Sequence, residues 1–544
     1  MNAILIGVGF ILLIVAAMRL TAYRLLRGTS LRDPTVDLTT PEEVPAALRQ
    51  ELDEGLLALL PLGFQARGYT RSMGIVADDP RPLWSALGEQ AQHGTWVQVF
   101  ANVSPEAEVP LRACFLTPLA DGRVLISAEG FVHLFPVPYA DAILLDHGEA
   151  DLVASGRRHL AELGRHQCGS PFPDAAAFVA RHQALNAAYL PMLRARELVA
   201  TDPTGRVRFT PAAAWAYLGR IRSGQGAQVR ALLALRKQRG GARGAVPAAI
   251  EADAVLRQEE MVERRVSAGS SLPLFLLTLL AFVATAPLVI SGGIPVPLIL
   301  AILLFHESGH FLAMRACGYR DTRIFFLPLF GAAASGRKRD ATIPQQVLVS
   351  LMGPLPGIIV GLALLAWAHA DRHSALFQPG LMLVAINLFN LLPVLPLDGG
   401  QILCRVLFAR RPWLDLVFRA VAAVAMIALG LATSPILIYL GIFLAIGLAQ
   451  QRQIARLRSR VMRDPAIAGL AGEPLTVAVC AAVARDAVTG RMPFAHRLRM
   501  VRDIAAALGQ PRITTTTRVA LLGTYVGAFL LAPGALLIWR LAHH

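Results

Sequence analysis

The sequence predicts a polytopic α-helical membrane protein that also carries a soluble α+β domain. The chain has 544 residues, of which 55% are hydrophobic and only 16% are charged, a balance more typical of membrane proteins than of soluble ones. About twenty apolar residues suffice to cross a bilayer. Long apolar runs fall near residues 2–18, 272–290, 294–316, 345–368, 380–403, 415–432, 435–450 and 519–540. We therefore expect about eight spans.

The alternation of apolar and polar stretches divides the chain into five parts. The N-terminal run is followed by Arg19, Arg24 and Arg27, the reverse of the charge order in a cleaved signal peptide, so we expect it to remain as a helix. The mixed stretch after it contains strand patterns such as "TWVQVFANV" and helix patterns such as "DAAAFVARHQALNAAYLPMLRAREL". The expected parts are an N-terminal transmembrane helix at 1–19, a soluble α+β domain at 20–268, a membrane-embedded core at 269–450, a cytoplasmic helical segment at 451–517 and a C-terminal transmembrane helix at 518–544.

Basic residues indicate which side of the membrane the loops occupy. A net charge of +15 would suggest nucleic-acid binding in a soluble protein, but no RNA-binding signature is present. The basic residues gather instead in "RACGYRDTR", "GRKRD", "RVLFARRPW" and "QQRQIARLRSR", close to apolar runs. The positive-inside rule places such segments on the cytoplasmic side. The chain is thus predicted to be a multi-pass protein, placed in a bacterial inner membrane, with a cytoplasmic soluble domain, the lipid bilayer as a partner and no nucleic acid.

Residues 318–344 do not fit a simple span. Both ends of this segment are basic, so the apolar stretch "IFFLPLFGAAASG" between them is too short to cross and return. Gly and Pro interrupt it, which favours a re-entrant loop or hairpin. Irregular backbone at membrane depth is tolerated only where protein or a water-filled cavity covers it.

The stretch "LLFHESGHFL" places three polar side chains inside an apolar run. Residues i and i+4 of a helix share a face, so His306 and His310 can present their imidazoles to one ion. Neutral imidazole is a good zinc ligand, and Glu307 is placed to act as a general base beside it. The pattern predicts a zinc site with Glu307 as a catalytic residue.

A catalytic zinc site needs a third protein ligand, and Asp398 is the predicted one. No histidine follows six residues after the motif, and the next glutamate after Glu307 is the distant Glu473. Asp398 stands in the apolar setting "NLFNLLPVLPLDGGQIL", where a carboxylate is costly unless it has a partner. We therefore expect one Zn²⁺ per chain, held between two transmembrane helices. Asn387 and Asn390 lie just upstream, and their amides could donate to an oxyanion or hold a substrate carbonyl, or be structural.

Taken together, these motifs resemble the site-2 protease family of intramembrane zinc metalloproteases. "FHESGH" and "NLLPVLPLDGG" match its two motifs, and the resemblance implies that Asp398 is the third zinc ligand and that Asn390 assists at the reacting carbonyl. "LPLFGAAASG" is similar to the family's membrane-associated hairpin, which is thought to dock substrate as an extended strand. "LMGPLPGII" resembles its G-P-L-x-N turn, but Gly357 stands where asparagine is usual. The similarity covers about residues 290–405.

The resemblance implies a zinc metalloendopeptidase that cleaves peptide bonds within or near transmembrane segments of membrane proteins. Other functions remain open at this point. The histidines could make ordinary interhelical hydrogen bonds, the protein could be a proteolytically silent zinc-binding scaffold, or it could be an ion or solute transporter. Inverted repeats would favour a transporter, and the sequence shows none. The domain at 20–268 is expected to gate access, recruit substrate or bind a regulator.

Overall fold

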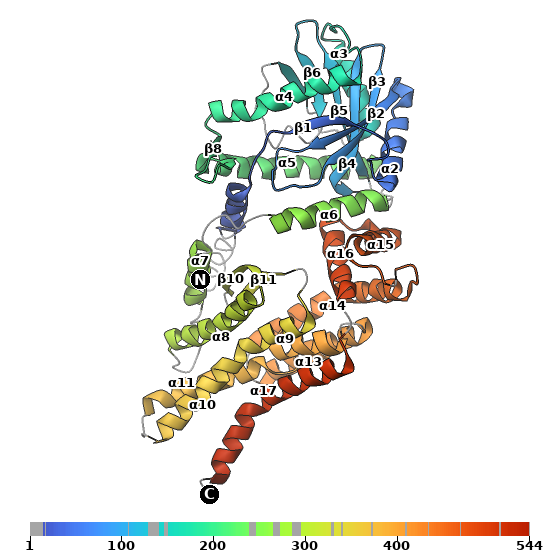
Figure 1. Cartoon of the computed structure of the whole chain (residues 1–544). Coiled ribbons are helices and arrows are strands. Elements are labelled where there is room, and N and C mark those ends of the chain that lie inside the picture. Colours follow the sequence, from blue (N-terminus) through green and yellow to red (C-terminus); the bar gives the residue numbers. More distant parts are fainter. Residues whose placement is uncertain are drawn as a thin grey trace. The chain divides into compact units, whose positions relative to one another are not determined.

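The chain folds into two compact units, which we call the sheet unit (Arg19–Gly269 and Ala471–Arg502) and the helical unit (Met1–Met18, Ser270–Leu470 and Asp503–His544) (Figure 1). The structure is a computed structural model, and the predicted N-terminal span at 1–19 lies almost wholly outside the residues it describes. The described residues are 15–16, 18–106, 108–128, 141–145, 151–238, 246–264, 272–285, 295–327, 331–338, 341–370, 374–408, 411–432, 435–467, 469–510 and 513–542.

The sheet unit is built on a seven-stranded sheet whose strands lie in sequence order, from β1 to β7. Neighbouring strands are antiparallel, except for the parallel pair β6 and β7. Such an order needs only short connections between most strands. The strands are β1 Thr35–Thr39, β2 Gln65–Met73, β3 Leu83–Gln90, β4 Thr95–Glu106, β5 Val109–Pro118, β6 Val124–Ala128 and β7 Ala142–Leu145, and a separate pair is formed by β8 Val199–Thr201 and β9 Val207–Phe209.

Helices cover both faces of this sheet because its central strands are apolar on both sides. Along β4, Val97 and Val99 face one layer of helices, whereas Trp96 faces the other and stacks on Phe178 at 5.1 Å between ring centroids. The expected α+β domain is therefore present as a sheet between helices. Its helices are α2 Ala46–Leu57, α3 Leu152–Leu163, α4 Ala175–Ala195, α5 Pro211–Gln238, α6 Ala248–Arg264, α15 Gly472–Arg485 and α16 Phe494–Gly509, of which α16 belongs to this unit up to Arg502.

A buried ion pair attaches the second chain segment of the sheet unit to the first. Arg497 of α16 and Glu251 of α6 are 1% and 0% exposed, and the guanidinium donates to both carboxylate oxygens at 3.0 and 2.9 Å. Burial raises the pKa of the Glu251 carboxyl, and the paired Arg497 opposes that rise. Residues Ala471–Arg502 thus share a core with Arg19–Gly269 and are not part of one separate segment spanning 451–517.

The helical unit holds the apolar part of the chain. In its described residues, five helices are long and apolar enough to cross a membrane, namely Val296–Ala316, Ile343–Ala370, Pro412–Ala432, Leu437–Arg463 and Thr515–Ala535. In the runs at 272–290 and 380–403 the described residues form shorter apolar helices, and 286–290 lie outside the described residues, so the count of about eight spans is not confirmed. The elements are α7 Leu272–Thr285, α8 Val296–Ala316, α9 Ile343–Met352, α10 Pro354–Ala370, α11 Ser374–Asn390, α12 Asp398–Leu403, a π-helical turn Cys404–Phe408, α13 Pro412–Ala432, α14 Pro435–Arg463 and α17 Thr515–Ala542.

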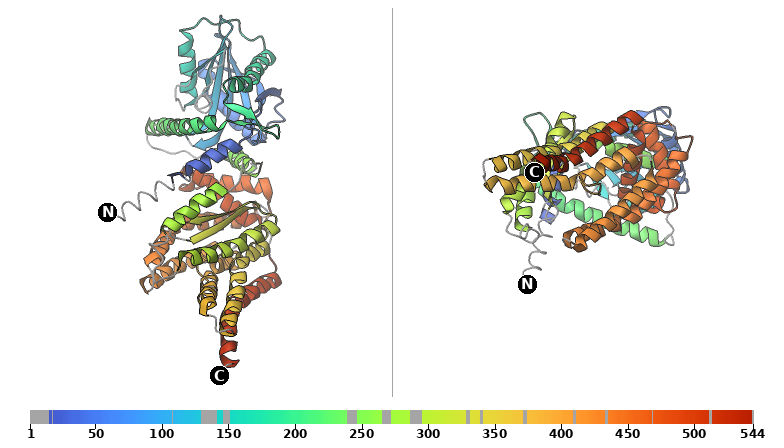
Figure 2. Two further views of the ribbon diagram at one scale, coloured as in Figure 1. Left: turned by 90° about the vertical axis from the view of Figure 1, so that its left-hand side faces the viewer. Right: turned by 90° about the horizontal axis from the view of Figure 1, so that it is seen from below.

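A two-stranded hairpin occupies the segment predicted to be a re-entrant loop or hairpin. Its strands β10 Arg320–Leu327 and β11 Gly331–Arg337 are antiparallel, with Ile324 opposite Ala334. The hairpin lies against α7 and α8 (Figure 2). The ring of Phe326 is buried between Phe275 and Phe282 of α7, which fixes β10 to that helix.

We expect Arg497→Met to lower the free energy of unfolding by about 3–5 kcal/mol, because it leaves the Glu251 carboxylate buried and unpaired. The double variant Arg497→Met/Glu251→Leu should recover most of this loss, since an apolar pair no longer needs charge compensation. Thermal unfolding of the full chain in detergent measures both effects. Equal destabilisation by the single and the double variant would contradict this account.

Candidate active site and metal centre

The first half of the site comes from one face of α8. This helix begins after Pro295, with a further proline in its first turn, and carries His306, Glu307 and His310 in its second half. The four-residue spacing sets both imidazoles on the same side, with ring centroids 4.8 Å apart and planes at 82°. All three side chains are buried, at 4%, 6% and 8% exposure.

The second half comes from a break between α11 and α12. Helix α11 ends at Asn390, and α12 begins at Asp398 after a turn rich in proline. A Cβ on Gly399 would lie 2.1 Å from the carbonyl oxygen of Leu391, so only glycine lets α12 fold back onto this turn. The hydroxyl of Tyr525 in α17 donates to the same carbonyl at 2.8 Å. These contacts hold the turn that presents Asp398, which is 8% exposed, to α8.

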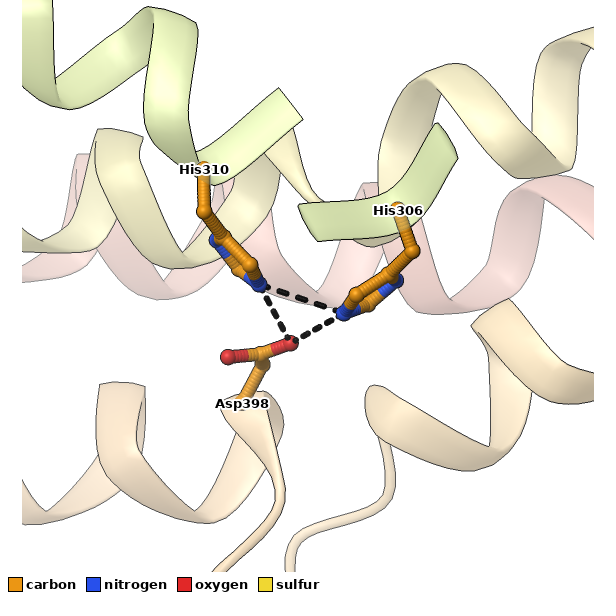
Figure 3. Close-up of side chains that lie close together, drawn as sticks. All are labelled: His306, His310 and Asp398. Atoms are coloured by element: carbon orange, nitrogen blue, oxygen red, sulfur yellow. Dashed lines mark hydrogen bonds and ion pairs between the residues drawn. The ribbon is translucent and has the colours of Figure 1, made fainter. Parts of the chain in front are cut away.

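Three atoms meet where the two halves face each other (Figure 3). The Nε2 atoms of His306 and His310 are 3.1 Å apart, and Oδ2 of Asp398 lies 3.3 and 3.2 Å from them. Ligands of a tetrahedral zinc ion about 2.0–2.1 Å from the metal are separated by about 3.3 Å. The spacing of the three atoms therefore fits zinc, and the donor set of two imidazoles and one carboxylate is one that zinc accepts.

Hydrogen bonds on the far side of each ring determine which nitrogen faces the cluster as an acceptor. Nδ1 of His310 lies 2.7 Å from the carbonyl oxygen of Val349, which can only accept, so this nitrogen carries the proton. Nδ1 of His306 lies 2.7 Å from Oδ1 of Asn387. With both Nδ1 atoms protonated, the neutral rings direct lone pairs towards the carboxylate. Three acceptors at this spacing repel one another unless a cation lies among them.

Glu307 lies beside this cluster and next to the hairpin. Its electrostatic neighbours are His306, His310 and Asp398, and the backbone of Ala334 in β11 is a hydrogen-bonding neighbour of its carboxylate. A carboxylate beside these three atoms and beside a strand that, among the described residues, pairs on one side only is suited to move a proton during a reaction along that strand.

The two asparagines have different surroundings. The amide nitrogen of Asn390 donates to the carbonyl of Ile386, one helical turn back, at 3.0 Å. This bond lies within α11 and does not involve the three clustered atoms. Its role at a reacting carbonyl therefore stays a prediction. Asn387 instead reaches His306, with Oδ1 lying 2.7 Å from Nδ1 of the ring.

Some functional contacts were invisible in the sequence. The Val349 carbonyl, the Ala334 backbone and the Tyr525 hydroxyl all act on the site through tertiary contacts. A carbonyl or amide is present at every residue, so no residue type marks these positions. Tyr525 carried a weak signal, as a polar tip within the last apolar run.

The site's first motif lies in a recognised family domain. Residues 296–372 match the family model described as Peptidase family M50. The chain carries a peptidase family M50 domain, and its resemblance to the site-2 protease family is confirmed. Asp398 lies beyond the matched residues, so its place in the site comes from the structure.

Named relatives agree with this family. The chain is 26% identical over 179 residues to a zinc metalloprotease from Methanocaldococcus jannaschii, over 30% of this chain and 51% of the relative. It is 32% identical over 109 residues to stage IV sporulation protein FB of Bacillus subtilis, over 19% of this chain and 37% of the relative. The chain thus spans about half or less of the length of these relatives. A solved site-2 protease from Methanocaldococcus jannaschii aligns with 33% of this chain and 88% of its own at 23% identity, with a TM-score of 0.25.

We expect Asp398→Ala to reduce the zinc retained after purification, because two imidazoles alone leave the metal without its anionic ligand. Asp415→Ala is the matched control, since this aspartate of the same unit pairs with Arg419 at 3.2 Å and lies outside the ligand group. Metal analysis of both purified variants tests the assignment. Unchanged zinc in Asp398→Ala would exclude Asp398 as a ligand.

Proposed function

We propose that this protein is a zinc metalloendopeptidase that cleaves peptide bonds within or near transmembrane segments of membrane proteins. The observation that carries the proposal is the convergence of His306, His310 and Asp398 within 3.3 Å of one another in a buried site on apolar helices. We further propose that the site holds one zinc ion per chain. The chemistry that zinc supplies when bound is polarisation of a carbonyl and acidification of a water molecule.

The side chains of this protein would divide the remaining work. His306, His310 and Asp398 hold the metal, and their burial keeps bulk water away from the reacting bond. Glu307 takes a proton from the attacking water as the new carbon–oxygen bond forms and gives it to the amine as the carbon–nitrogen bond breaks, so both proton transfers pass through one carboxylate. Asn390 is the candidate to assist at the reacting carbonyl, as the family resemblance implies.

The hairpin offers a way to bind substrate in a cleavable form. The carbonyls of a transmembrane helix are occupied by hydrogen bonds, so a substrate must unwind before its peptide bond can be attacked. Among the described residues, β11 pairs with β10 alone, and its residues Gly331–Ala334 carry little or no side chain. An extended substrate segment added along β11 would have its freed backbone groups satisfied next to Glu307.

Partners and location belong to the same proposal. The substrate would be a transmembrane protein, and the lipid bilayer would surround the apolar helices in a bacterial inner membrane. The domain predicted at 20–268, now extended by Ala471–Arg502, would face the cytoplasm and bind a regulator or recruit substrate.

Glu307→Gln should retain zinc but lose cleavage, because the three ligands are unchanged and the proton acceptor is removed. A loss of at least about 100-fold in rate is expected from the size of general acid–base effects. Cleavage of a candidate membrane substrate in detergent or vesicles, with metal analysis in parallel, measures both. Equal cleavage by wild type and variant would remove Glu307 from the mechanism.

Substrates with weakened helices should be cleaved faster. Exchanging Ala for Gly within a helix costs about 1 kcal/mol, which raises the unwound population about fivefold. We expect a similar gain in cleavage rate when Gly is placed near the scissile bond of a model transmembrane substrate. The control places the same Gly two turns away from that bond. Equal rates for both positions would argue against unwinding as a limiting step.

A further inference from the structure

We infer that Asn387 is a positioning residue that orients His306 for the metal, and that Gly357 is required because it makes room for this asparagine. The inference rests on the metal site of the proposed function. It adds that residues of α10 and α11 behind His306 influence how tightly the metal is bound. It is carried by two hydrogen bonds and one close approach.

The two hydrogen bonds of Asn387 determine which ring nitrogen of His306 carries the proton. The side chain is 0% exposed, and its Nδ2 donates to the carbonyl of Leu383 at 2.8 Å. A carbonyl oxygen can only accept, so this contact fixes the amide nitrogen away from the ring and turns Oδ1 towards Nδ1 of His306, 2.7 Å away. The ring must then carry its proton on Nδ1. Its other nitrogen, Nε2, is left with a lone pair directed at the cluster.

The same contacts fix where the ring points. An imidazole attached to α8 by two rotatable bonds could turn away from Asp398, and a hydrogen bond to a buried, immobile amide prevents this. His310 receives the equivalent support from the Val349 carbonyl, which comes from the backbone of α9 and needs no particular side chain. His306 has a side-chain amide in that place, so its support can be removed by substitution.

Gly357 provides the space for this amide. An ideal Cβ built on Gly357 of α10 would lie 2.2 Å from Nδ2 and 2.5 Å from Cγ of Asn387. Carbon atoms that are not bonded do not approach so closely, and Asn387 cannot shift without losing one of its two hydrogen bonds. Gly357 contacts none of the three proposed ligands. We expect it to affect the metal site because it packs against Asn387, which contacts His306.

Zinc affinity of the purified full chain, measured by competition with a chromogenic chelator, tests the inference without relying on activity. Asn387→Leu keeps the number and branching of the side-chain heavy atoms but removes the acceptor, and we expect zinc affinity to fall by about 10–100-fold. Asn387→Asp keeps an acceptor for Nδ1 but loses the donor to the Leu383 carbonyl, so its zinc affinity should fall less than that of Asn387→Leu. Thr285→Ala is the matched control, because the buried Thr285 of α7 also donates to a carbonyl of its own helix, that of Ala281 at 2.9 Å, and has no part in the site, so this variant should bind zinc as the wild type does.

A double-mutant cycle separates positioning from general packing. Gly357→Ala alone should weaken zinc binding, whereas Gly357→Ala added to Asn387→Ala should cost little more, since the new methyl enters space that the asparagine vacated. Thermal unfolding of each variant verifies that the chain is folded. Wild-type affinity in Asn387→Leu, or additive losses in the cycle, would overturn the inference. A wild type that binds no zinc would instead remove the proposed metal site itself.

Discussion

The structure of the helical unit depends on one electrostatic constraint, which is that three electron-pair acceptors face one another inside an apolar environment. Elsewhere the protein neutralises buried charge internally. In the sheet unit, Arg497 pairs with Glu251, and the nearly buried Arg257 pairs with Asp79 at 3.0 Å. At the cluster of His306, His310 and Asp398, the Nδ1 atom of each imidazole has an acceptor on the far side, so a neutral ring that donates there turns a lone pair on Nε2 towards the carboxylate. A metal cation satisfies this arrangement at the observed spacing, and it explains why polar groups occur at this depth.

Meeting that constraint requires three chain segments to approach more closely than side chains normally permit. The sequence provides glycine at the contacts. Gly353 lies against the ring of His310, Gly357 against Asn387 and Gly399 against the Leu391 carbonyl, and each would place a Cβ within 2.2 Å of its neighbour. The apolar core around them includes Ala528 and Ala532 of α17, a helix far outside the matched family domain. The candidate metal site is thus built by local close approach and stabilised by a core that includes residues of α17, the last helix of the chain that the structure describes.

The grouping of three polar side chains was easier to predict from the sequence than the helices around it. A polar side chain costs free energy in an apolar run, and this cost drew attention to His306, His310 and Asp398. A cation shared by the three side chains accounts for all of them together. The strand at 95–103 and the helix at 174–198 followed from side-chain periodicity, and both are present as β4 and α4. The number of spans was harder, because apolar runs do not say where a helix stops. The run at 380–403 is divided between α11 and the six-residue α12, since the turn that carries Asp398 must leave the helix to reach α8.

Gly357 illustrates why a departure from a family pattern is informative only with coordinates. On the sequence alone, glycine in place of asparagine at this position suggests that an amide has been lost from the site. In the structure an amide is present at that place, contributed by Asn387 from the neighbouring helix, and its volume is incompatible with any side chain at 357. In this chain α11 supplies the hydrogen-bond acceptor behind His306, and α10 supplies the space that this acceptor needs. A sequence search for such sites should accordingly look for an asparagine on one of these two helices and a glycine at the facing position of the other, and treat the two residues as a pair.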